Sequence, residues 1–557
     1  MREEQGQMSS APPETGNPYQ NPDGSLGTRT AWYALTLVVL MQAMSMVDRQ
    51  ILSILLPRIK ADLNVGDAEM GLLYGTVFAL FYALFSLPLG RLADGWIRTR
   101  LLAVSLLGWS LATGLAGFAK GFSVLAVSRL GVGIGEASSQ PAGLSLLSDA
   151  FPKEKRGLIG AAMAVAVALG LGAALTIGGS IADWWDGRWP VAADAPMGFA
   201  GWQAAFIGAA LPGIVLAFFM WRLPEPVRGA ADGIVVKRDP APFRASFGLL
   251  GAILPVGVWV NFVRRRAATK DWVLNTIVLI VVIAAAIALT RFTDGLRENN
   301  PIVIPIGGTG LTGNGIQWLV SGFGVYVLFN WVQSLKLNDR PAYVTMAKNP
   351  ALLIVIFMAS LQTALNYGVM AFTPSYLMGN FNQSATQVGL LFGPFIAALG
   401  ILGPVIAGPA SDWAEKRMKS GRLVITLASL VVSPLCALAV YTTDSLAMFY
   451  VFFTGFSIAT TMWLPPIYAS LMDLVLPRMR GMVTSFYILS ITLIGQGVGP
   501  YAVGLMSDRN GGDLAEAILT LYWVAVPIVV LSALAIWRYR LDEPQVVARA
   551  RAAGEPI

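Results

Sequence analysis

The sequence predicts an all-α polytopic membrane protein with two related six-helix halves and two further membrane-spanning helices between them. Of the 557 residues, 55% are hydrophobic and 13% are charged, and the mean hydropathy is +0.63. These values lie outside the range of soluble globular proteins. Apolar runs of about 20 residues, long enough to cross a bilayer, recur along the chain. Asp149 and Arg156-Gly157 return 324 positions later as Asp473 and Arg480-Gly481, which indicates a duplicated half.

The apolar runs divide the chain into five segments. Residues 1–30 are polar and are expected to form a disordered cytoplasmic tail, with no cleavable signal peptide before the first run. An N-terminal bundle is predicted over 31–226, with helices near 31–56, 69–90, 100–119, 122–149, 157–182 and 201–222. A C-terminal bundle is predicted over 350–540, with helices near 350–376, 386–410, 422–441, 444–472, 481–506 and 515–537. Residues 541–557 are expected to form a second cytoplasmic tail.

The central insert, 227–349, contains three more apolar runs, at 245–262, 271–291 and 316–335. Both flanks of the insert lie on the same side of the membrane, so an even number of these runs must cross. The first run contains Pro255 and is followed by three arginines, 264–266, which suits a segment held at the headgroup layer. The expected architecture is therefore twelve plus two spans.

The charge pattern predicts the orientation and excludes several classes of function. Loops assigned to the cytoplasm hold most of the Lys and Arg residues, which predicts that both termini lie on the cytoplasmic side of the inner membrane. The same bias explains the net charge of +7, so no nucleic-acid partner is expected. The chain has no histidine and one cysteine, Cys436, so we expect no metal site, no cofactor and no disulfide within the chain. A proton exchanged near neutral pH must then be carried by a carboxylate whose pKa the protein shifts.

Four ionisable residues lie within predicted spans, where a charge is costly and therefore indicates function. Asp48 and Arg49 lie on the first helix, and Arg129 and Glu136 lie seven residues apart on one face of the fourth. The four charges together are neutral, whereas protonation of either carboxylate leaves an arginine free to bind an anion. We therefore predict proton coupling at Asp48 and Glu136 and anion binding at Arg49 and Arg129. The alternative is a purely structural ion-pair network.

The C-terminal half carries no charge in the middle of a span. Its polar side chains cluster on the seventh helix, and two more could join them across the cavity. The predicted substrate-binding residues of this half are Gln362, Thr363, Asn366, Tyr367, Trp463 and Gln496. Uncharged polar and aromatic groups opposite an arginine-bearing half suit an amphipathic substrate. Ordinary helix packing is the alternative.

Two loops carry a shared pattern of glycine, aspartate and basic residues. Gly90 is followed by Asp94 and Arg98, and Gly408 is followed by Asp412 and Arg417. Here the chain resembles the major facilitator superfamily, although Gly95 and Trp413 stand where that family usually has a basic residue. The resemblance implies that these residues, with the repeated pairs, form charged gates that hold the cytoplasmic face shut in the outward-open state. The predicted gate residues are Asp94, Arg98, Asp149, Arg156, Asp412, Arg417, Asp473 and Arg480. Helix capping and loop charge bias are the alternative.

Longer stretches are similar to the spinster-like branch of this superfamily. They include Val47-Asp48-Arg49-Gln50, the run from Ser128 to Ala137, the loop from Phe151 to Gly157 and the exit from Leu223 to Gly229. Members of this branch move lysophospholipids and sphingoid phosphates, and bacterial members are considered proton-linked. The resemblance implies a major facilitator fold in which the carboxylates carry protons and the arginines bind the headgroup of the substrate.

These observations favour a monomeric, proton-coupled secondary transporter in the lipid bilayer of the inner membrane. Its expected substrate is a small amphipathic organic anion or a lysolipid-like molecule, moved by alternating access between two bundles. Efflux of unrelated hydrophobic drugs and uptake of a carboxylate nutrient are the alternatives within transport. A non-transporting sensor or a membrane-embedded enzyme is the alternative outside it, although the chain has no nucleophile motif and no P-loop. The sequence leaves the direction of transport and the role of the insert open.

Overall fold

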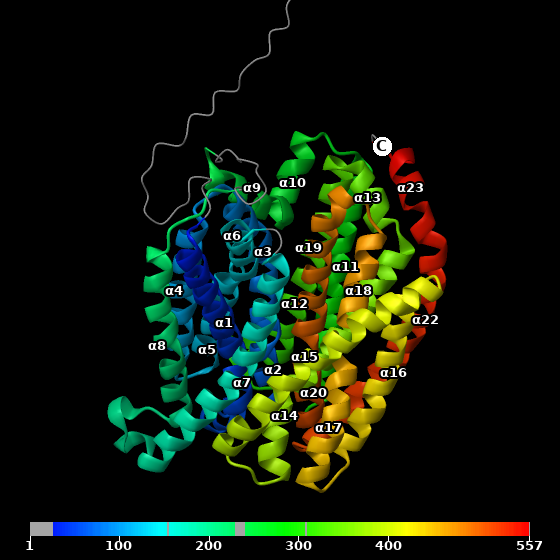
Figure 1. Ribbon diagram of the computed structural model, residues 1–557. Coiled ribbons are helices and arrows are strands. Elements are labelled where there is room, and N and C mark those ends of the chain that lie inside the picture. The colour runs from blue at the N-terminus through cyan, green and yellow to red at the C-terminus, as the bar shows by residue number, and fades with distance from the viewer. Residues whose placement is uncertain (1–25, 153–154, 229–239, 307–308, 556–557) are drawn as a thin grey trace, which may run out of the picture.

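The computed structural model describes residues 26–152, 155–228, 240–306 and 309–555. In this part of the chain, thirteen helical segments are long and apolar enough to cross a membrane. Two shorter helices, α5 (Phe122–Glu136) and α6 (Ser139–Ala150), follow each other through the same layer and make one further crossing (Figure 1). The predicted all-α architecture of twelve plus two spans is confirmed. Most of the tail predicted over 1–30 lies outside the described residues.

The N-terminal half contains eight helices, because two of its crossings are broken. Their bounds are α1 Thr28–Leu63, α2 Asp67–Tyr74, α3 Thr76–Gly95, α4 Arg98–Ala116, α5 and α6 as above, α7 Arg156–Arg188 and α8 Gly201–Arg222. The helix α1 ends at Asn64, which adopts a left-handed conformation (φ 52°) that asparagine tolerates better than most residues. The chain then turns directly into α2, so the first two crossings are antiparallel neighbours.

The C-terminal half repeats this plan. Its helices are α14 Pro350–Asn380, α15 Ala385–Arg417, α16 Gly421–Tyr441, α17 Leu446–Thr461, α18 Leu464–Asp473, α19 Arg480–Ser490, α20 Gly497–Arg509, α21 Leu514–Leu521, α22 Ala525–Asp542 and α23 Val546–Ala552. Side chains that accept hydrogen bonds from free N–H groups begin several of them, as at Asn349 before α14, Ser384 before α15 and Asp513 before α21. Helical structure continues to Ala552, so much of the tail predicted over 541–557 is ordered.

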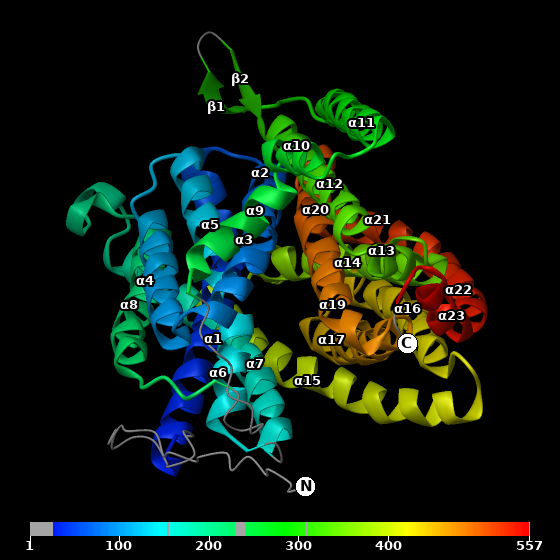
Figure 2. The same ribbon diagram turned by 90° about the horizontal axis from the view of Figure 1, so that it is seen from above.

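The insert contains α9 (Pro242–Ile253), α10 (Pro255–Arg264), α11 (Thr269–Asp294), α12 (Gly313–Asn338) and α13 (Arg340–Ala347). The first apolar run is broken before Pro255 into two short helices, while α11 and α12 are long enough to span. The sequence analysis did not predict the antiparallel hairpin of β1 (Ile302–Ile306) and β2 (Thr309–Thr312), in which Ile304 pairs with Leu311. Seen from above, the green insert lies along one side of the two halves (Figure 2).

The molecule has two opposite faces, a terminal face and a distal face, which differ in their distance from the chain ends. The terminal face is where α1 begins and α23 ends, and it is uppermost in Figure 1. The distal face is the opposite one, where α1 ends and α2 begins. The helices α9 and α10 lie on the terminal face (Figure 1). The β-hairpin lies at the distal end, where the hydroxyl of Ser123 near the start of α5 donates to the carbonyl of Val303 at 3.3 Å.

Corresponding crossings of the two halves are broken at the same depth. The fourth crossing breaks between α5 and α6 at Ala137-Ser138, and its counterpart breaks between α17 and α18 at Met462-Trp463. A second interruption is particular to the C-terminal half, where a π-helical turn over Ile491–Gln496 separates α19 from α20. Interruptions of this kind are tolerated in membranes where they line a protein interior and often mark functional sites.

Candidate functional site

The four charged residues predicted within spans come together in the N-terminal half. Asp48 and Arg49 project from the middle of α1, and Arg129 and Glu136 project from α5. Glu136 is the last residue of α5, so its side chain lies at the break in the fourth crossing. The side chains of Asp48 and Glu136 are completely buried, and Arg129 is 2% exposed. The sequence prediction of a buried charge cluster on these two helices therefore matches the geometry.

One ion pair dominates this cluster. The Nε atom of Arg49 donates to Oε2 of Glu136 at 2.6 Å, and the hydroxyl of Ser45 donates to the same oxygen at 2.8 Å. The guanidinium of Arg49 also lies over the rings of Phe78 and Tyr82, with its central carbon 4.7 and 4.6 Å from the two centroids. Cation–π contacts of this kind hold an arginine in place without using its remaining N–H donors. Arg49 is thus oriented by two rings and one carboxylate.

The other two charges are close together but not paired. The Nη1 atom of Arg129 donates to the main-chain carbonyl of Asp48 at 2.7 Å, while its Nε and Nη2 atoms have no partner among the described residues. Neither carboxylate oxygen of Asp48 has a hydrogen-bond partner in that part of the chain. Buried polar atoms are almost always hydrogen-bonded, so unpaired ones mark a place where a proton or ligand can be taken up. Among the described residues the cluster thus holds one ion pair, in which Oε1 of Glu136 has no partner, beside an aspartate and an arginine with further unpaired atoms.

The predicted binding residues of the C-terminal half surround a smaller, uncharged network. The amide of Gln362 donates to Asn366 at 2.9 Å, and Asn366 exchanges hydrogen bonds with the hydroxyl and carbonyl of Thr460 at 2.7 and 3.2 Å. Tyr367, also on α14, lies near Arg49 and so approaches the charged cluster from the opposite half. Three of the predicted residues, Gln362, Asn366 and Tyr367, therefore lie close to Thr460. Thr460 itself was not predicted from the sequence.

The remaining predicted binding residues take different positions. Trp463 is buried at the α17–α18 break, and its indole N–H has no partner among the described residues. Gln496 ends the π-helical turn. Thr363 lies at a helix contact instead: its hydroxyl donates to the carbonyl of Ala359, and its Cβ would lie 2.6 Å from a Cβ placed on Gly495. Thr363 is therefore placed where it packs α14 against the π-helical turn.

The terminal face carries two equivalent arginine–aspartate pairs. In the N-terminal half, Arg98 donates to Asp149 at 2.5 Å and to Glu225 at 2.7 Å, and its side chain is fully buried. In the C-terminal half, Arg422 donates to Asp473 at 2.5 Å. Arg98 and Arg422 are separated by the same 324 positions as the two aspartates. The repeat offset would have identified Arg422, which the sequence analysis passed over.

The other predicted gate residues form fewer contacts. Oδ1 of Asp412 lies 3.3 Å from Nη2 of Arg422. Arg417 stacks on Trp413, with its guanidinium carbon 3.8 Å from the ring centroid. Asp94 and Arg480 are exposed. The side chain of Arg156 lies outside the described residues. The Arg98 and Arg422 pairs each join helices within one half, so they do not bridge the halves in this conformation.

The two halves meet instead near the distal face. The carboxylate of Asp508, at the end of α20, accepts from the N–H groups of Asp67 and Ala68 at the start of α2, at 2.7 and 2.9 Å. In the same way Asp183, at the end of α7, accepts from the N–H of Thr386 at the start of α15, at 2.7 Å. Each aspartate thus caps the first turn of a helix of the other half, where the helix dipole favours a negative charge.

These capping contacts bring the backbones very close. A Cβ placed on Gly179 would lie 2.4 Å from the carbonyl of Ala385, and one on Gly504 would lie 2.1 Å from the carbonyl of Asp67. Only glycine fits at such contacts, as is usual where membrane helices cross closely. Gly179 and Gly504 are 325 positions apart in the sequence, as are Asp183 and Asp508, so these residues belong to the internal repeat. The structure places them at the closed distal end of the molecule.

Comparisons with known proteins agree with this fold. Residues 38–359 and 352–556 each match the family described as Major Facilitator Superfamily. An MFS-type efflux pump of Mycolicibacterium smegmatis is 25% identical over 525 residues, which cover 93% of this chain and 95% of the pump. The sphingosine-1-phosphate transporter SPNS2 of Danio rerio is 23% identical over 490 residues, 87% of this chain and 77% of that protein.

A solved structure shares the same fold. It is described as a bacterial homologue of the human lysosomal transporter spinster in an inward-facing and unoccupied conformation. Its TM-score is 0.64 at 20% identity, and the match covers 94% of this chain and 99% of the other. The resemblance to spinster proteins inferred from the sequence is thus found again in curated relatives and in a solved fold. Since the family matches cover both halves and the insert, the chain belongs to the Major Facilitator Superfamily and is a transporter rather than an enzyme.

Proposed function

We propose that this protein is a proton-coupled secondary transporter of the inner membrane that moves an amphipathic organic anion or a lysolipid-like molecule by alternating access. The observation that carries the proposal is the buried cluster of Asp48, Arg49, Arg129 and Glu136, in which one carboxylate is paired and the other has no partner in the described residues. The named activity of the SPNS2 relative, transport of sphingosine-1-phosphate, supports a substrate with a charged head and an apolar body.

In the proposed cycle, the carboxylate of Glu136 and the anionic head of the substrate compete for Arg49. With Glu136 ionised, Arg49 is held by the carboxylate and the cluster as a whole is neutral. A proton arriving on Glu136 removes the negative partner, so the N–H donors of Arg49 become available to the anionic head of a substrate. Arg129, with two unused donor nitrogens, supplies a second cation. Proton and anion occupancy are then linked by electrostatics, as a buried unpaired charge is costly.

The C-terminal half is proposed to hold the apolar and neutral parts of the substrate. Tyr367 faces the arginines, and Asn366 and Trp463 present polar and aromatic surface at the same depth. We assign the terminal face to the cytoplasm because its loops hold most of the basic residues. The closed distal contacts then correspond to an inward-facing state, which is also the state named for the spinster-like solved structure.

Reconstitution of the purified protein in liposomes with a pH-sensitive dye inside tests the coupling. Lysolipids and organic anions added one at a time should cause a proton flux in the wild type. In Glu136→Gln that flux should fall to the level of protein-free liposomes, whereas Glu516→Gln, an exposed glutamate on α21, should behave as the wild type. If the proton flux survives in Glu136→Gln but is lost in Asp48→Asn, Asp48 rather than Glu136 carries the proton. Labelled substrate that crosses without protons refutes coupling.

A second candidate is efflux of unrelated hydrophobic drugs. The relative named as an MFS-type efflux pump, which matches nearly the whole chain, favours it. An uncharged drug gains nothing from a buried cation, so Arg129→Gln should leave drug efflux intact but weaken transport of an anion at least tenfold. Arg222→Gln is the matched control, because Arg222 lies at the end of α8 and outside the cluster. Equal loss for both kinds of substrate would instead indicate a structural role for Arg129.

A further inference from the structure

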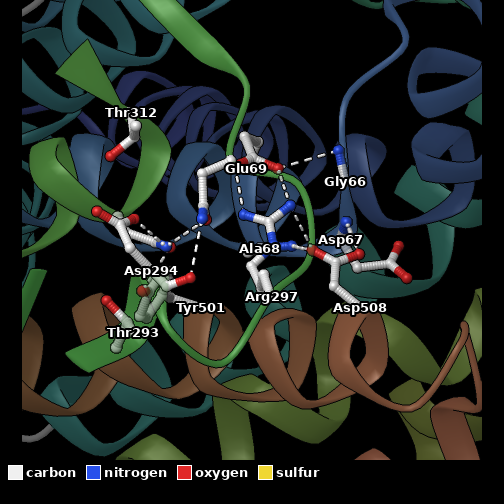
Figure 3. A network of polar contacts seen from close by, with 12 residues as sticks. Gly66, Asp67, Ala68, Glu69, Thr293, Asp294, Arg297, Thr312, Tyr501 and Asp508 are labelled. Atoms are coloured by element: carbon white, nitrogen blue, oxygen red, sulfur yellow. Dashed lines mark hydrogen bonds and ion pairs between the residues drawn. The ribbon is translucent and has the colours of Figure 1, made fainter. Parts of the chain in front are cut away.

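The part of the insert nearest the distal face contacts both halves at once. Arg297 follows α11, and its guanidinium donates to both carboxylate oxygens of Glu69 in α2, at 2.7 and 2.9 Å. Its Nη2 atom also lies 2.9 Å from the carboxylate of Asp508 in α20. Figure 3 shows the guanidinium between the two acidic side chains. One arginine of the insert therefore joins a residue of the N-terminal half to a residue of the C-terminal half.

This bridge is buried and tightly enclosed. The side chains of Arg297, Glu69 and Asp508 are 6%, 0% and 13% exposed. A Cβ placed on Gly313, the first residue of α12, would lie 2.5 Å from Glu69, so no larger residue fits beside the pair. Two-point contacts between arginine and carboxylate are strong and directional, and they become stronger when water is excluded. The arrangement has the features of a formed site rather than a chance surface contact.

A second residue of the insert repeats the bridge one turn into α12. The side-chain oxygen of Gln317 lies 2.5 Å from the hydroxyl of Thr76, and its amide donates to the carbonyl of Gly497 at 3.3 Å. The hydroxyl of Thr76 also contacts that carbonyl directly and can donate its single proton to either oxygen. Thr76 begins α3 in the N-terminal half, and Gly497 begins α20 in the C-terminal half. Gln317 is fully buried. Two independent residues of the insert thus bind the same α2–α3 and α20 contact.

At the equivalent contact on the other side of the molecule, the arginine found among the described residues pairs within one half. Asp183 caps α15 as Asp508 caps α2, but its arginine partner, Arg58, comes from α1 of the same half as Asp183. Arg58 also pairs with Asp186, again within the N-terminal half. The pseudo-symmetry of the halves therefore accounts for the caps but not for a guanidinium that joins them. That addition comes from the insert.

We propose that the insert supplies gate residues to the distal face: Arg297 and Gln317 hold α2 and α20 together and so favour the conformation that is closed there. Opening of the distal face separates Glu69 from Asp508, and Arg297 can then keep only one of them. An element shifts a conformational equilibrium only by contacts that differ between the states, and these contacts do. The inference rests on the alternating access of the proposed function but not on its substrate or its proton coupling.

Distance measurements between spin labels test this without any substrate. Because Cys436 is the only cysteine, Cys436→Ser gives a clean background. Gly187→Cys with Gly379→Cys labels the distal ends of α7 and α14, and Gly160→Cys with Gly481→Cys labels the terminal ends of α7 and α19. All four glycines have open space where a side chain would project.

In Arg297→Gln the ratio of distally open to distally closed molecules should rise at least tenfold, with longer distal and shorter terminal distances. Gln317→Leu should cause a smaller shift in the same direction. Arg291→Gln, the same change of charge on the exposed face of α11, should cause none. Should Arg297→Gln fail to fold because Glu69 loses its partner, Arg297→Gln with Glu69→Gln removes both charges and should show the same shift.

Unchanged distances in folded Arg297→Gln or in the double variant, together with unchanged distances in Gln317→Leu, overturn the proposal. The outcome is separate from that of the liposome experiment. If the distal face opens in Arg297→Gln but the wild type moves no protons, the gate proposal is supported and the proposal of proton coupling is refuted. If the wild type moves protons but the distances in the variants do not change, proton coupling is supported and the gate proposal is refuted.

Discussion

The two halves of this transporter share a backbone plan but differ in the charges at their centre. Both break their fourth crossing at the same depth, at Ala137 in one half and Met462 in the other. At this level the N-terminal half places Glu136 in an ion pair with Arg49, whereas the C-terminal half places Asn366 in hydrogen bonds with Thr460. Duplication therefore accounts for the frame, and divergence of a few side chains accounts for the chemistry.

This difference suggests a division of labour. Charges concentrated in one half can respond to a proton without disturbing the other half, because the uncharged network needs no counter-ion when the cluster changes protonation. Rocking of the halves about the central layer then carries a charged surface past a neutral one. If the division holds, changes of charge should affect the two halves unequally, and the predictions below test this in order of expected size.

The largest difference is expected between the two arginines at the terminal face. Arg98 is fully buried against Asp149 and Glu225, whereas Arg422 is 23% exposed beside Asp473. Removing one partner of a buried pair costs about 3–5 kcal/mol, and removing one of an exposed pair costs about 1 kcal/mol or less. Arg98→Gln should therefore lower the thermal unfolding midpoint in detergent markedly more than Arg422→Gln. Equal unfolding midpoints in the two variants would show that the two pairs contribute equally to the stability of the fold.

The next effect concerns Arg49, the paired cation of the central cluster. Arg49→Gln removes a charge-assisted contact worth about 1.5–3 kcal/mol, equivalent to a loss of roughly 10- to 150-fold in binding of an anionic substrate. Ligand-induced stabilisation of the purified protein measures this directly. Arg49→Lys should recover only part of the affinity, because a lysine has neither the planar fork nor the same stacking on Phe78 and Tyr82. Full affinity in Arg49→Gln would remove Arg49 from the binding site.

A charge added to the neutral half tests the same division from the other side. Asn366→Asp places a carboxylate beside Gln362 and Thr460, the hydrogen-bond partners of Asn366 in the described residues, and neither is a counter-ion. Transport of an anion should fall about tenfold, equivalent to roughly 1.4 kcal/mol, through like-charge repulsion. Asn338→Asp, on the exposed end of α12, is the matched control. An uncharged amphiphile transported equally by both variants would confirm that the loss is electrostatic.

Sequence reasoning predicted the fold better than it predicted the contacts. Hydropathy and the internal repeat were enough for the spans, and the rarity of buried charge was enough for the cluster around Glu136. The hydrogen-bond and ion-pair partners of these residues were harder to predict, because they depend on which helices pack against each other. Arg422 could have been found from the offset of 324 positions, and the paired caps Asp183 and Asp508 repeat at an offset of 325. Arg297 has no counterpart in the repeat, so its partners required the packed structure.

The smallest effect concerns charges that the C-terminal half carries outside the membrane. Arg478 donates to Asp339 of the insert at 2.7 Å and also pairs with Glu555 at the chain end. Hydrogen bonds from this guanidinium hold the pKa of Asp339 and the pKa of Glu555 below their ordinary values. A carboxylate with a lowered pKa stabilises the folded contact above its unfolded pKa, and the contribution disappears as the pH falls through the folded value.

The contact that joins α13, α23 and the Arg478 loop should therefore be intact at neutral pH and be lost only in acid, below the ordinary carboxylate range. Hydrogen exchange of α23 between pH 7 and about pH 3, corrected for the intrinsic exchange rate, should show constant protection down to the ordinary carboxylate range and a fall below it. Arg478→Gln should lower the protection at neutral pH and make it independent of pH. A loss of protection near pH 6 in the wild type would mean that another group controls this contact, since both carboxylates remain ionised there.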